Sequence, residues 1–230
     1  MRALVTGSNG GIGTALVARL RADGFDVVTL DVAPPAELLI DLEHDDVPAL
    51  DDIDVCVSNA GLTAILSPAH RMSREKWERD LAVNLSGSFR VVQACLGGMR
   101  ERGFGRIVVT SSMFGRFGAP GQVAYAASKA GLVGMVKSIA AENVRRGITA
   151  NAVLPGMVAT PAVLAMPAEV VDRVRDSMMP MGRMATPQEV AALVAFLVSP
   201  DAGYITGQAI GIDGGASLNT LSLGREDQDG

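Results

Sequence analysis

A chain of 230 residues is long enough for one α/β domain with a sizeable core. Its net charge of −5, with the basic residues scattered, argues against nucleic acid as the main partner. No apolar run reaches the ~18 residues of a membrane span, and MRALVTG leads directly into a strand pattern, so we expect no signal peptide, no membrane partner and a cytoplasmic location.

Residues 3–24 predict a strand, a glycine-rich turn and a helix. The turn reads T-G-x-x-x-G-x-G, with Gly7, Gly11 and Gly13, instead of the more usual G-x-G-x-x-G. Backbone N–H groups at a helix N-terminus can bind a phosphate at close range. We therefore expect the phosphates of a dinucleotide here, with an ordinary strand–helix turn as the alternative.

Residues 25–31 predict a second strand that ends at Asp31. A carboxylate at this position can accept hydrogen bonds from an adenosine ribose and would repel a 2′-phosphate. The sequence therefore favours NAD over NADP. The alternative is an aspartate that only opens the turn before Pro34 and Pro35.

The next segment is short. Residues 37–42 predict a brief third strand, and residues 44–50 allow at most two helical turns. Parallel neighbours usually need a crossover of about a dozen residues, and residues 32–37 are too few and too rich in proline to form a helix. We expect a bare loop that leaves the adenine side of a cofactor site open.

Residues 54–61 predict a fourth strand that ends in a turn of small residues, where the backbone can approach a flat ligand. Residues 77–103 predict a long helix with a polar Asn84 among apolar neighbours. A buried asparagine that satisfies a carbonyl is the alternative to a functional role. Residues 105–112 predict a fifth strand with Ser112 at its C-terminal end, the edge where open α/β sheets bind ligands.

Tyr125 and Lys129 stand four residues apart in an alanine-rich segment that predicts a helix, so they share one helix face. A phenol titrates near ~10. A cation about 5 Å away at an effective dielectric of about 20 favours the phenolate by roughly 3 kcal/mol, or about two pK units. We therefore expect Lys129 to lower the pKa of Tyr125 and to bring the phenol most of the way to a working general base. The alternative is a core tyrosine and a solvated lysine.

Residues 147–161 predict a sixth strand and its exit loop, and residues 205–215 predict a seventh strand. The irregular, Met- and Pro-rich residues 161–184 suggest a lid. A helix follows, with Thr186 as its N-cap.

This alternation of strands and helices predicts an α/β fold with a doubly wound, parallel, seven-stranded, Rossmann-like sheet. We expect a single domain over residues 1–215 with a short lid insert, and a polar tail over residues 216–230.

The cysteines and histidines give no sign of a metal or disulfide site. Cys56 and Cys95 lie in apolar surroundings without C-x-x-C spacing and are expected to be reduced core thiols. His44 and His70 stand in polar, loop-like contexts without a carboxylate or thiol cluster, so we expect no metal.

Motifs in order along nearly the whole chain carry a family resemblance. They are TGSNGGIG (6–13), SNAG (58–61), Asn84 in VNLSGSF, Ser112, YAASK (125–129), PGMVATP (155–161) and ITGQAIGIDGG (205–215). The sequence resembles the short-chain dehydrogenases/reductases. Its C-terminal half is most similar to 3-oxoacyl-(acyl carrier protein) reductases and related NAD-dependent alcohol dehydrogenases.

The resemblance implies a role for each catalytic candidate. Tyr125 would be the general acid/base, and Lys129 would lower its pKa and hold the nicotinamide ribose. Ser112 would bind the substrate oxygen, because its thirteen-residue separation from Tyr125 matches the family and that of Ser111 does not. Asn84 would hold a water in a proton relay.

The resemblance also implies a cofactor site that runs along the carboxyl edge of the sheet. Its expected residues are Gly7, Ser8, Asn9, Gly11, Ile12 and Gly13 at the pyrophosphate, Asp31 at the adenosine ribose, Asp41 and Leu42 at the adenine, Asn59, Ala60 and Gly61 at the second half of the cofactor with Tyr125 and Lys129, and Pro155, Gly156, Val158 and Thr160 at the nicotinamide. The region between Asp31 and Asp54 is shorter than the family norm.

These observations lead to the hypothesis of an oxidoreductase that transfers a hydride between NAD and a secondary alcohol or ketone. The alternative is a non-catalytic NAD-binding regulator or scaffold. Family members are usually tetramers, and residues 80–101 and 124–145 carry apolar side chains on more than one helix face, so a homotetramer or homodimer is expected.

Overall fold

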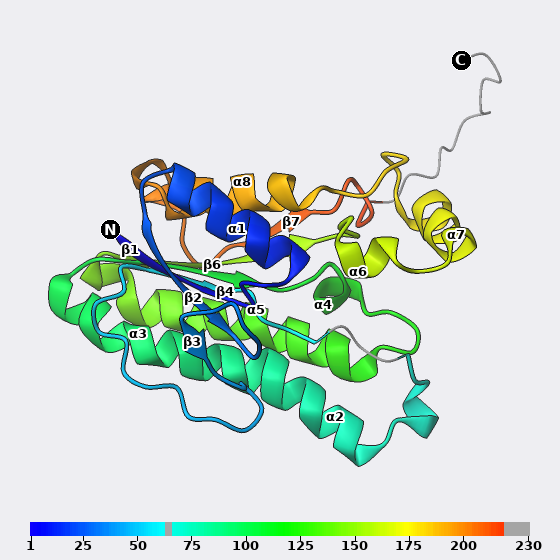
Figure 1. Cartoon of the computed structure of the whole chain (residues 1–230), viewed down its shortest axis with the longest axis horizontal. Helices are drawn as coiled ribbons and strands as arrows, with labels where there is room; N and C mark the ends of the chain where they lie inside the picture. The colour runs from blue at the N-terminus through cyan, green and yellow to red at the C-terminus, as the bar shows by residue number, and fades with distance from the viewer. Residues whose placement is uncertain (63–65, 219–230) are drawn as a thin grey trace, which may run out of the picture.

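The computed structural model describes residues 1–62 and 66–218 (Figure 1). Seven strands form one parallel sheet in the order β3-β2-β1-β4-β5-β6-β7. The strands are β1 (Arg2–Thr6), β2 (Asp26–Asp31), β3 (Leu38–Leu39), β4 (Val55–Ser58), β5 (Gly105–Thr110), β6 (Ile148–Pro155) and β7 (Ala209–Ile212). The predicted doubly wound sheet is therefore confirmed. The strand order reverses between β1 and β4, and ligands of such sheets bind at this switch point.

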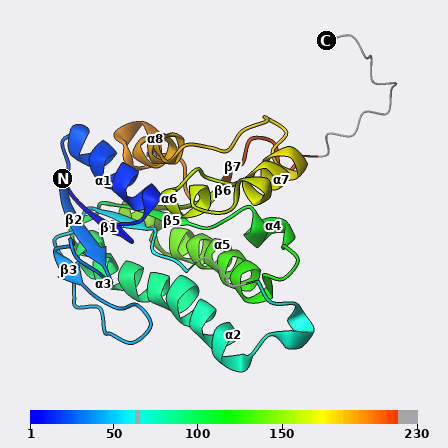
Figure 2. The same cartoon turned by 45° about the vertical axis from the view of Figure 1, so that its right-hand side comes forward.

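Helices cover both faces of the sheet (Figures 1 and 2). They are α1 (Gly11–Ala22), α2 (Arg74–Leu81), α3 (Ser88–Arg102), α4 (Phe114–Phe117), α5 (Val123–Asn143), α6 (Pro161–Leu164), α7 (Ala168–Met178) and α8 (Pro187–Val198), with 3-10 turns at Ala69–Arg71, Val144–Arg146 and Pro200–Ala202. Helices α3 and α5 pack on one face, where Val92 and Leu132 are fully buried. Helices α1 and α8 pack on the other, where Leu16 and Val194 are fully buried.

The long helix predicted around Asn84 is interrupted. A π-helical segment, Ala82–Gly87, joins α2 to α3. Such segments carry one extra residue in a turn and are frequent at functional sites. Asn84 lies in this segment and is fully buried, so the interruption coincides with the side chain that the sequence had marked as unusual.

The connection between β2 and β3 is the expected bare loop, since residues 32–37 form no helix. Strand β3 covers only two of the six residues predicted for it, and no helix forms between β3 and β4 among the described residues. The segment between β3 and β4 is held in place by side chains from α2 and α3. Arg79 pairs with Glu43, with Nε 3.0 Å from Oε2, and the Arg90 guanidinium donates to the carbonyl oxygen of Leu42.

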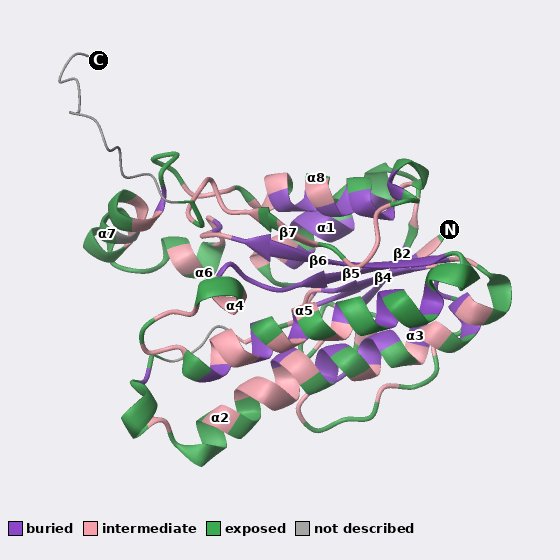
Figure 3. Cartoon of the chain, turned by 180° about the vertical axis from the view of Figure 1, so that it is seen from behind, coloured by how far each residue is buried: buried purple, intermediate pink, exposed green. Residues whose placement is uncertain are grey.

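The predicted lid segment forms α6 and α7, which lie beyond the carboxyl end of β6, and α7 is largely exposed (Figure 3). Its closure over a substrate stays a prediction. The predicted N-cap at Thr186 is confirmed, and it forms a capping box: its hydroxyl accepts from the Glu189 N–H and the Glu189 carboxylate accepts from the Thr186 N–H. Arg183 donates two hydrogen bonds to the Glu189 carboxylate, with nitrogen–oxygen distances of 2.7 and 2.9 Å. This pairing lowers the pKa of Glu189 to about 2.

No helix in the described residues is long and apolar enough to cross a bilayer. Most of the predicted tail, residues 219–230, lies outside the described part of the chain.

Candidate active site

The glycine-rich turn between β1 and α1 is closed so tightly that side chains are excluded. A Cβ on Gly13 would lie 1.9 Å from the Gly7 carbonyl oxygen, and one on Gly7 would lie 2.8 Å from the Ala60 Cα. Gly7 also has a φ of +63°, which favours glycine. The turn therefore brings the N-terminal end of α1 against the turn that follows β4.

The turn fits a phosphate-bearing group. The Ser8 hydroxyl is buried and has no hydrogen-bond partner among the described residues. A buried hydroxyl without a partner is costly, so it fits a site where a ligand completes the bonding. Ile12 is half-buried and packs against the core on the α1 side of the sheet. Expected pyrophosphate residues are thus gathered at one helix N-terminus, which favours an anion.

Asp31, at the end of β2, faces the glycine turn. One carboxylate oxygen accepts a hydrogen bond from the Asn9 N–H at 2.9 Å, and the other accepts from the Ala33 N–H at 3.3 Å. The turn and this strand end are therefore held together by the carboxylate. The Asp31 carboxylate therefore places a negative charge beside the glycine turn, where the adenosine ribose of a bound dinucleotide would lie next to its pyrophosphate.

The opposite end of the expected cofactor site meets the same turn. A Cβ on Gly11 would lie 2.8 Å from the Thr160 Cβ, and Thr160 is the N-cap of α6. Val158 is buried. A Cβ on Gly156 would lie 2.9 Å from the Asp213 Cα, so the loop that follows Pro155 is confined between β7 and the glycine turn.

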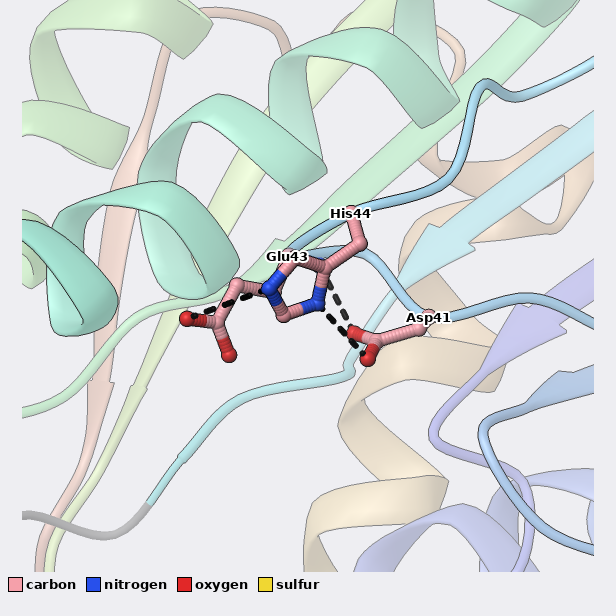
Figure 4. A group of neighbouring side chains, drawn as sticks. All are labelled: Asp41, Glu43 and His44. Atoms are coloured by element: carbon pink, nitrogen blue, oxygen red, sulfur yellow. Dashed lines mark hydrogen bonds and ion pairs between the residues drawn. The ribbon is translucent and has the colours of Figure 1, made fainter.

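The predicted absence of a carboxylate cluster around a histidine is wrong for His44. Its ring lies between two carboxylates (Figure 4), with Nδ1 3.1 Å from Asp41 Oδ2 and Nε2 3.9 Å from Glu43 Oε1. The hydrogen bond to Asp41 and the charge of Glu43 raise the pKa of His44. Because Asp41, Glu43 and His44 are close neighbours on a tight loop, the folded turn creates a cluster that the sequence pattern does not show.

The side chains of this cluster contact one another and Arg79. The two ring nitrogens face different carboxylates, and Glu43 is already paired with Arg79. Leu42 is buried in the core, and the half-buried Asp41 remains the polar group at the expected adenine end.

The catalytic candidates converge where β5, α5 and the π-helical segment meet. The Lys129 ammonium lies 5.7 Å from the centre of the Tyr125 ring and donates to the Thr110 carbonyl oxygen at 2.9 Å. A Cβ on Gly61 would lie 3.1 Å from both the Lys129 Nζ and the Asn84 Oδ1. One small space is therefore bounded by the lysine, the asparagine and the glycine.

The expected lowering of the Tyr125 pKa is wrong for the chain as folded. Burial is the largest effect and raises the pKa of Tyr125; an interaction with the Ser112 hydroxyl lowers it, and the charge of Asp80 raises it. Lys129 is itself buried, which lowers its own pKa to about 8. Attraction between phenolate and ammonium favours ionisation of Tyr125, but both groups also lose hydration on burial, and this loss opposes ionisation more strongly.

The two serines after β5 have different tasks. The Ser111 hydroxyl donates to the Lys129 carbonyl oxygen at 2.7 Å and is buried against α5. The Ser112 hydroxyl accepts from the Phe114 N–H at 3.2 Å and interacts with the phenol. Ser112 is thus the serine that lies beside Tyr125.

Asn84 forms hydrogen bonds with neighbouring residues and also borders the site. Its Oδ1 accepts from the Leu62 N–H at 2.7 Å, and its Nδ2 donates to the Ser128 hydroxyl at 3.3 Å. The Ser128 hydroxyl donates in turn to the Tyr125 carbonyl oxygen at 2.7 Å. The structure therefore shows the structural role that the sequence left open, and the water-holding role stays a prediction.

The sequence patterns did not identify two of these partners. Thr110 acts through its backbone carbonyl, which leaves no mark on residue choice. Ser128 lies inside the YAASK motif, and its position one residue before Lys129 was the only available signal.

Replacing Lys129 with methionine is expected to stabilise the fold at neutral pH by about 2 kcal/mol. The lysine pKa is 10.5 in the unfolded reference and about 8 when folded. The unfolded chain therefore binds more protons between these values, and stability rises with pH across that window. At pH values below this window, burying the charged lysine costs the folded state about 3 kcal/mol. The methionine variant avoids this cost but loses the hydrogen bond to the Thr110 carbonyl, which offsets about 1 kcal/mol of the stabilisation.

Urea unfolding at neutral pH and again above the unfolded pKa measures this effect. The gain should shrink or reverse in the alkaline experiment. An equal gain at both pH values would show that Lys129 carries no burial penalty.

The fold and the site together define an oxidoreductase of the Rossmann-like α/β class. The parallel sheet carries a glycine turn suited to a dinucleotide, and the serine, tyrosine and lysine lie at the carboxyl edge of β5 and the start of α5.

Comparisons with known proteins agree with this class of protein. Residues 42–217 match the family described as enoyl-(acyl carrier protein) reductase. An acetoacetyl-CoA reductase from Rhizobium meliloti (strain 1021) is 37% identical over 234 residues, which cover 93% of this chain and 97% of the relative. The 3-oxoacyl-(acyl-carrier-protein) reductase MabA from Mycobacterium tuberculosis (strain ATCC 25618 / H37Rv) is 39% identical over 229 residues, covering 94% and 92%.

A solved structure is also similar over nearly its whole length. It is an oxidoreductase of the short-chain dehydrogenase/reductase family from Burkholderia thailandensis, with a TM-score of 0.86 and 36% identity, covering 95% of this chain and 93% of that one. The chain belongs to the short-chain dehydrogenase/reductase family, whose members bind nicotinamide cofactors.

Proposed function

We propose that this protein transfers a hydride between NAD and the 3-position of an acyl thioester, interconverting a 3-hydroxyacyl and a 3-oxoacyl group. The observation that carries the proposal is the convergence of Ser112, Tyr125 and Lys129 beside a glycine turn that excludes side chains. A 3-hydroxyacyl group is a secondary alcohol, and its oxidised form is a ketone. The proposal therefore narrows the substrate class that the sequence predicts.

The chain's own residues supply proton transfer and orientation. In the reductive direction Tyr125 donates its phenolic proton to the carbonyl oxygen, while the Ser112 hydroxyl donates a hydrogen bond that holds this oxygen. In the oxidative direction the same phenol accepts the hydroxyl proton. Lys129 holds positive charge beside the phenolate that forms. The nicotinamide, when bound, donates or accepts the hydride.

The substrate class is supported by the names of relatives and by the apolar side chains near the site. Two relatives are named for reductases of acetoacetyl-CoA and of 3-oxoacyl groups on acyl carrier protein. Met113 is buried next to Ser112, Phe114 is half-buried at the start of α4, and Met157 is half-buried on the loop after β6. Flexible thioether side chains suit an acyl chain.

An assay of acetoacetyl-CoA with NADH and with NADPH tests the proposal, with simple ketones as comparison substrates. We expect the thioester to be reduced with a higher kcat/KM than the simple ketones, and NADH to be preferred. Turnover of simple ketones alone would contradict the thioester assignment, and absence of turnover with any substrate would favour the non-catalytic alternative.

The preference for NAD is proposed from Asp31. Replacing Asp31 with alanine is expected to lower the ratio of kcat/KM for NAD to that for NADP by at least about tenfold, because the carboxylate can accept ribose hydrogen bonds and repels a 2′-phosphate. Asp26, at the exposed start of the same strand, is the matched control, and its alanine variant should leave the ratio unchanged. An unaltered ratio in the Asp31 variant would assign the cofactor choice to other residues.

The surface of α3 and α5 supports the expected oligomer. A shallow depression there is lined by Leu85 of the π-helical segment, Phe89 and Met135, together with Ser86 and Arg90, and Phe89 is 43% exposed. We propose that this face contacts a second copy of the chain in a homodimer or homotetramer. We also propose a cytoplasmic location.

A further inference from the structure

Helices α2 and α5 lie side by side and run in the same direction (Figures 1 and 2). Two contacts define their relative register just beyond α2. Asn84 is level with Ser128, 3.3 Å apart through Nδ2 and Oγ, and a Cβ on Gly131 would lie 2.8 Å from the Leu85 side chain. The wider turn of the π-helical segment leads back by about four residues from Asn84 to residue 80 at the end of α2, and the turn of α5 before Ser128 contains Tyr125.

Residue 80 is an aspartate. Asp80 is half-buried, and no lysine, arginine or histidine of the described residues forms an ion pair with it. Its neighbour Arg79 is turned toward the loop, where it pairs with Glu43 at 3.0 Å. A partly desolvated carboxylate without a partner is unfavourable for folding, and burial accordingly raises the pKa of Asp80.

We propose that Asp80 is a positioning residue for the proton transfer: its carboxylate, one helical turn before Asn84 and on a helix packed beside α5, favours the neutral phenol of Tyr125, the form that can donate to a ketone. This inference rests on the proposed function for its catalytic meaning, while the electrostatic effect on the tyrosine stands by itself.

The groups that face Tyr125 come from three elements. Ser112 follows β5, Lys129 belongs to α5 and Asp80 belongs to α2. The Asp80 carboxylate repels a phenolate, and its charge raises the pKa of Tyr125. Lys129 acts in the opposite sense, because its ammonium lies 5.7 Å from the ring centre and attracts a phenolate. Removing the Asp80 charge therefore lets the phenol ionise at lower pH.

The chain permits a direct measurement because it contains only two tyrosines. Tyr204 is fully exposed, so a Tyr204→Phe background leaves Tyr125 as the single phenol. Its ionisation can be followed by ultraviolet absorbance as the pH is raised, with circular dichroism recorded to define the folded range. The variants are Asp80→Asn, Asp80→Ser as a second neutral side chain, and Asp80→Glu, which keeps the charge.

We expect the midpoint of Tyr125 ionisation to fall by about half a pH unit or more in both neutral variants and to stay near the parent value in Asp80→Glu. Glu75→Gln is the matched control, since Glu75 is an exposed carboxylate on the same helix and its loss changes the net charge equally. A midpoint unchanged in the folded neutral variants, or shifted equally by Glu75→Gln, would overturn the proposal.

Kinetics then separate this inference from the proposed function. With an active enzyme, the alkaline fall of ketone reduction should move to lower pH by the same amount, and alcohol oxidation near neutral pH should rise about threefold. A shifted titration in a protein without turnover would leave the electrostatic effect intact and contradict the proposed function. A shifted titration with unmoved kinetic profiles would overturn the catalytic role of Asp80.

Discussion

Replacing Tyr125 with phenylalanine is expected to lower the turnover number by at least about a thousandfold while changing the affinity for NADH far less. Proton transfer by a positioned side chain contributes about a hundredfold to ten-thousandfold. Among the described residues, the phenol is the one acid/base group that lies beside both Ser112 and Lys129. The variant removes one oxygen and keeps the ring, so the packing of α5 should be preserved.

Stopped-flow measurement of NADH formation and a fluorescence titration with NADH provide the two readouts. Tyr204→Phe is the matched control, because Tyr204 is fully exposed and its loss should leave both readouts unchanged. A Tyr125 variant that retains more than about a tenth of the wild-type rate would show that another group carries the proton.

Replacing Gly13 with alanine is expected to weaken NADH binding by at least about a hundredfold and to destabilise the fold by about 2 to 4 kcal/mol. The added Cβ would lie 1.9 Å from the Gly7 carbonyl oxygen and 2.9 Å from the Ser8 Cα. Both are backbone atoms that a rotamer change cannot move. The turn must open, which displaces the N–H groups at the start of α1 and the buried Ser8 hydroxyl.

Gly134 is the matched control for this substitution. It lies inside α5, and a Cβ there would meet nothing within 4 Å, so alanine should stabilise the helix by about 1 kcal/mol. Thermal unfolding and NADH titration of both variants measure the difference. If Gly13→Ala binds NADH as the wild type does, the glycine turn is not the phosphate site.

The sheet could be predicted because each strand is marked by a local pattern. Short runs rich in apolar residues, such as 3–6 and 105–110, are followed by glycine or serine and then by a helix-forming segment. The capping box at Thr186 and the bare loop after Asp31 were predictable for the same reason, since both depend on neighbouring residues. The brevity of β3 depends instead on pairing with β2, where only Leu38 and Leu39 find partners.

The catalytic positions could be predicted from spacing, but their energetics could not. A separation of four residues places Tyr125 and Lys129 on one helix face, and the structure brings them together. The balance of burial against charge depends on what surrounds both groups, including Asp80 from a different helix. The cluster around His44 and the π-helical segment around Asn84 likewise arise from contacts made only in the folded chain.

The pH dependence of alcohol oxidation in Lys129→Met, compared with the wild type, tests the central claim most directly. If a cation beside Tyr125 makes the phenol a usable base, the variant should lose at least about a hundredfold at neutral pH and recover part of the rate as rising pH ionises the phenol. A variant whose rate and pH profile match those of the wild type would contradict the assignment of proton transfer to this tyrosine–lysine pair.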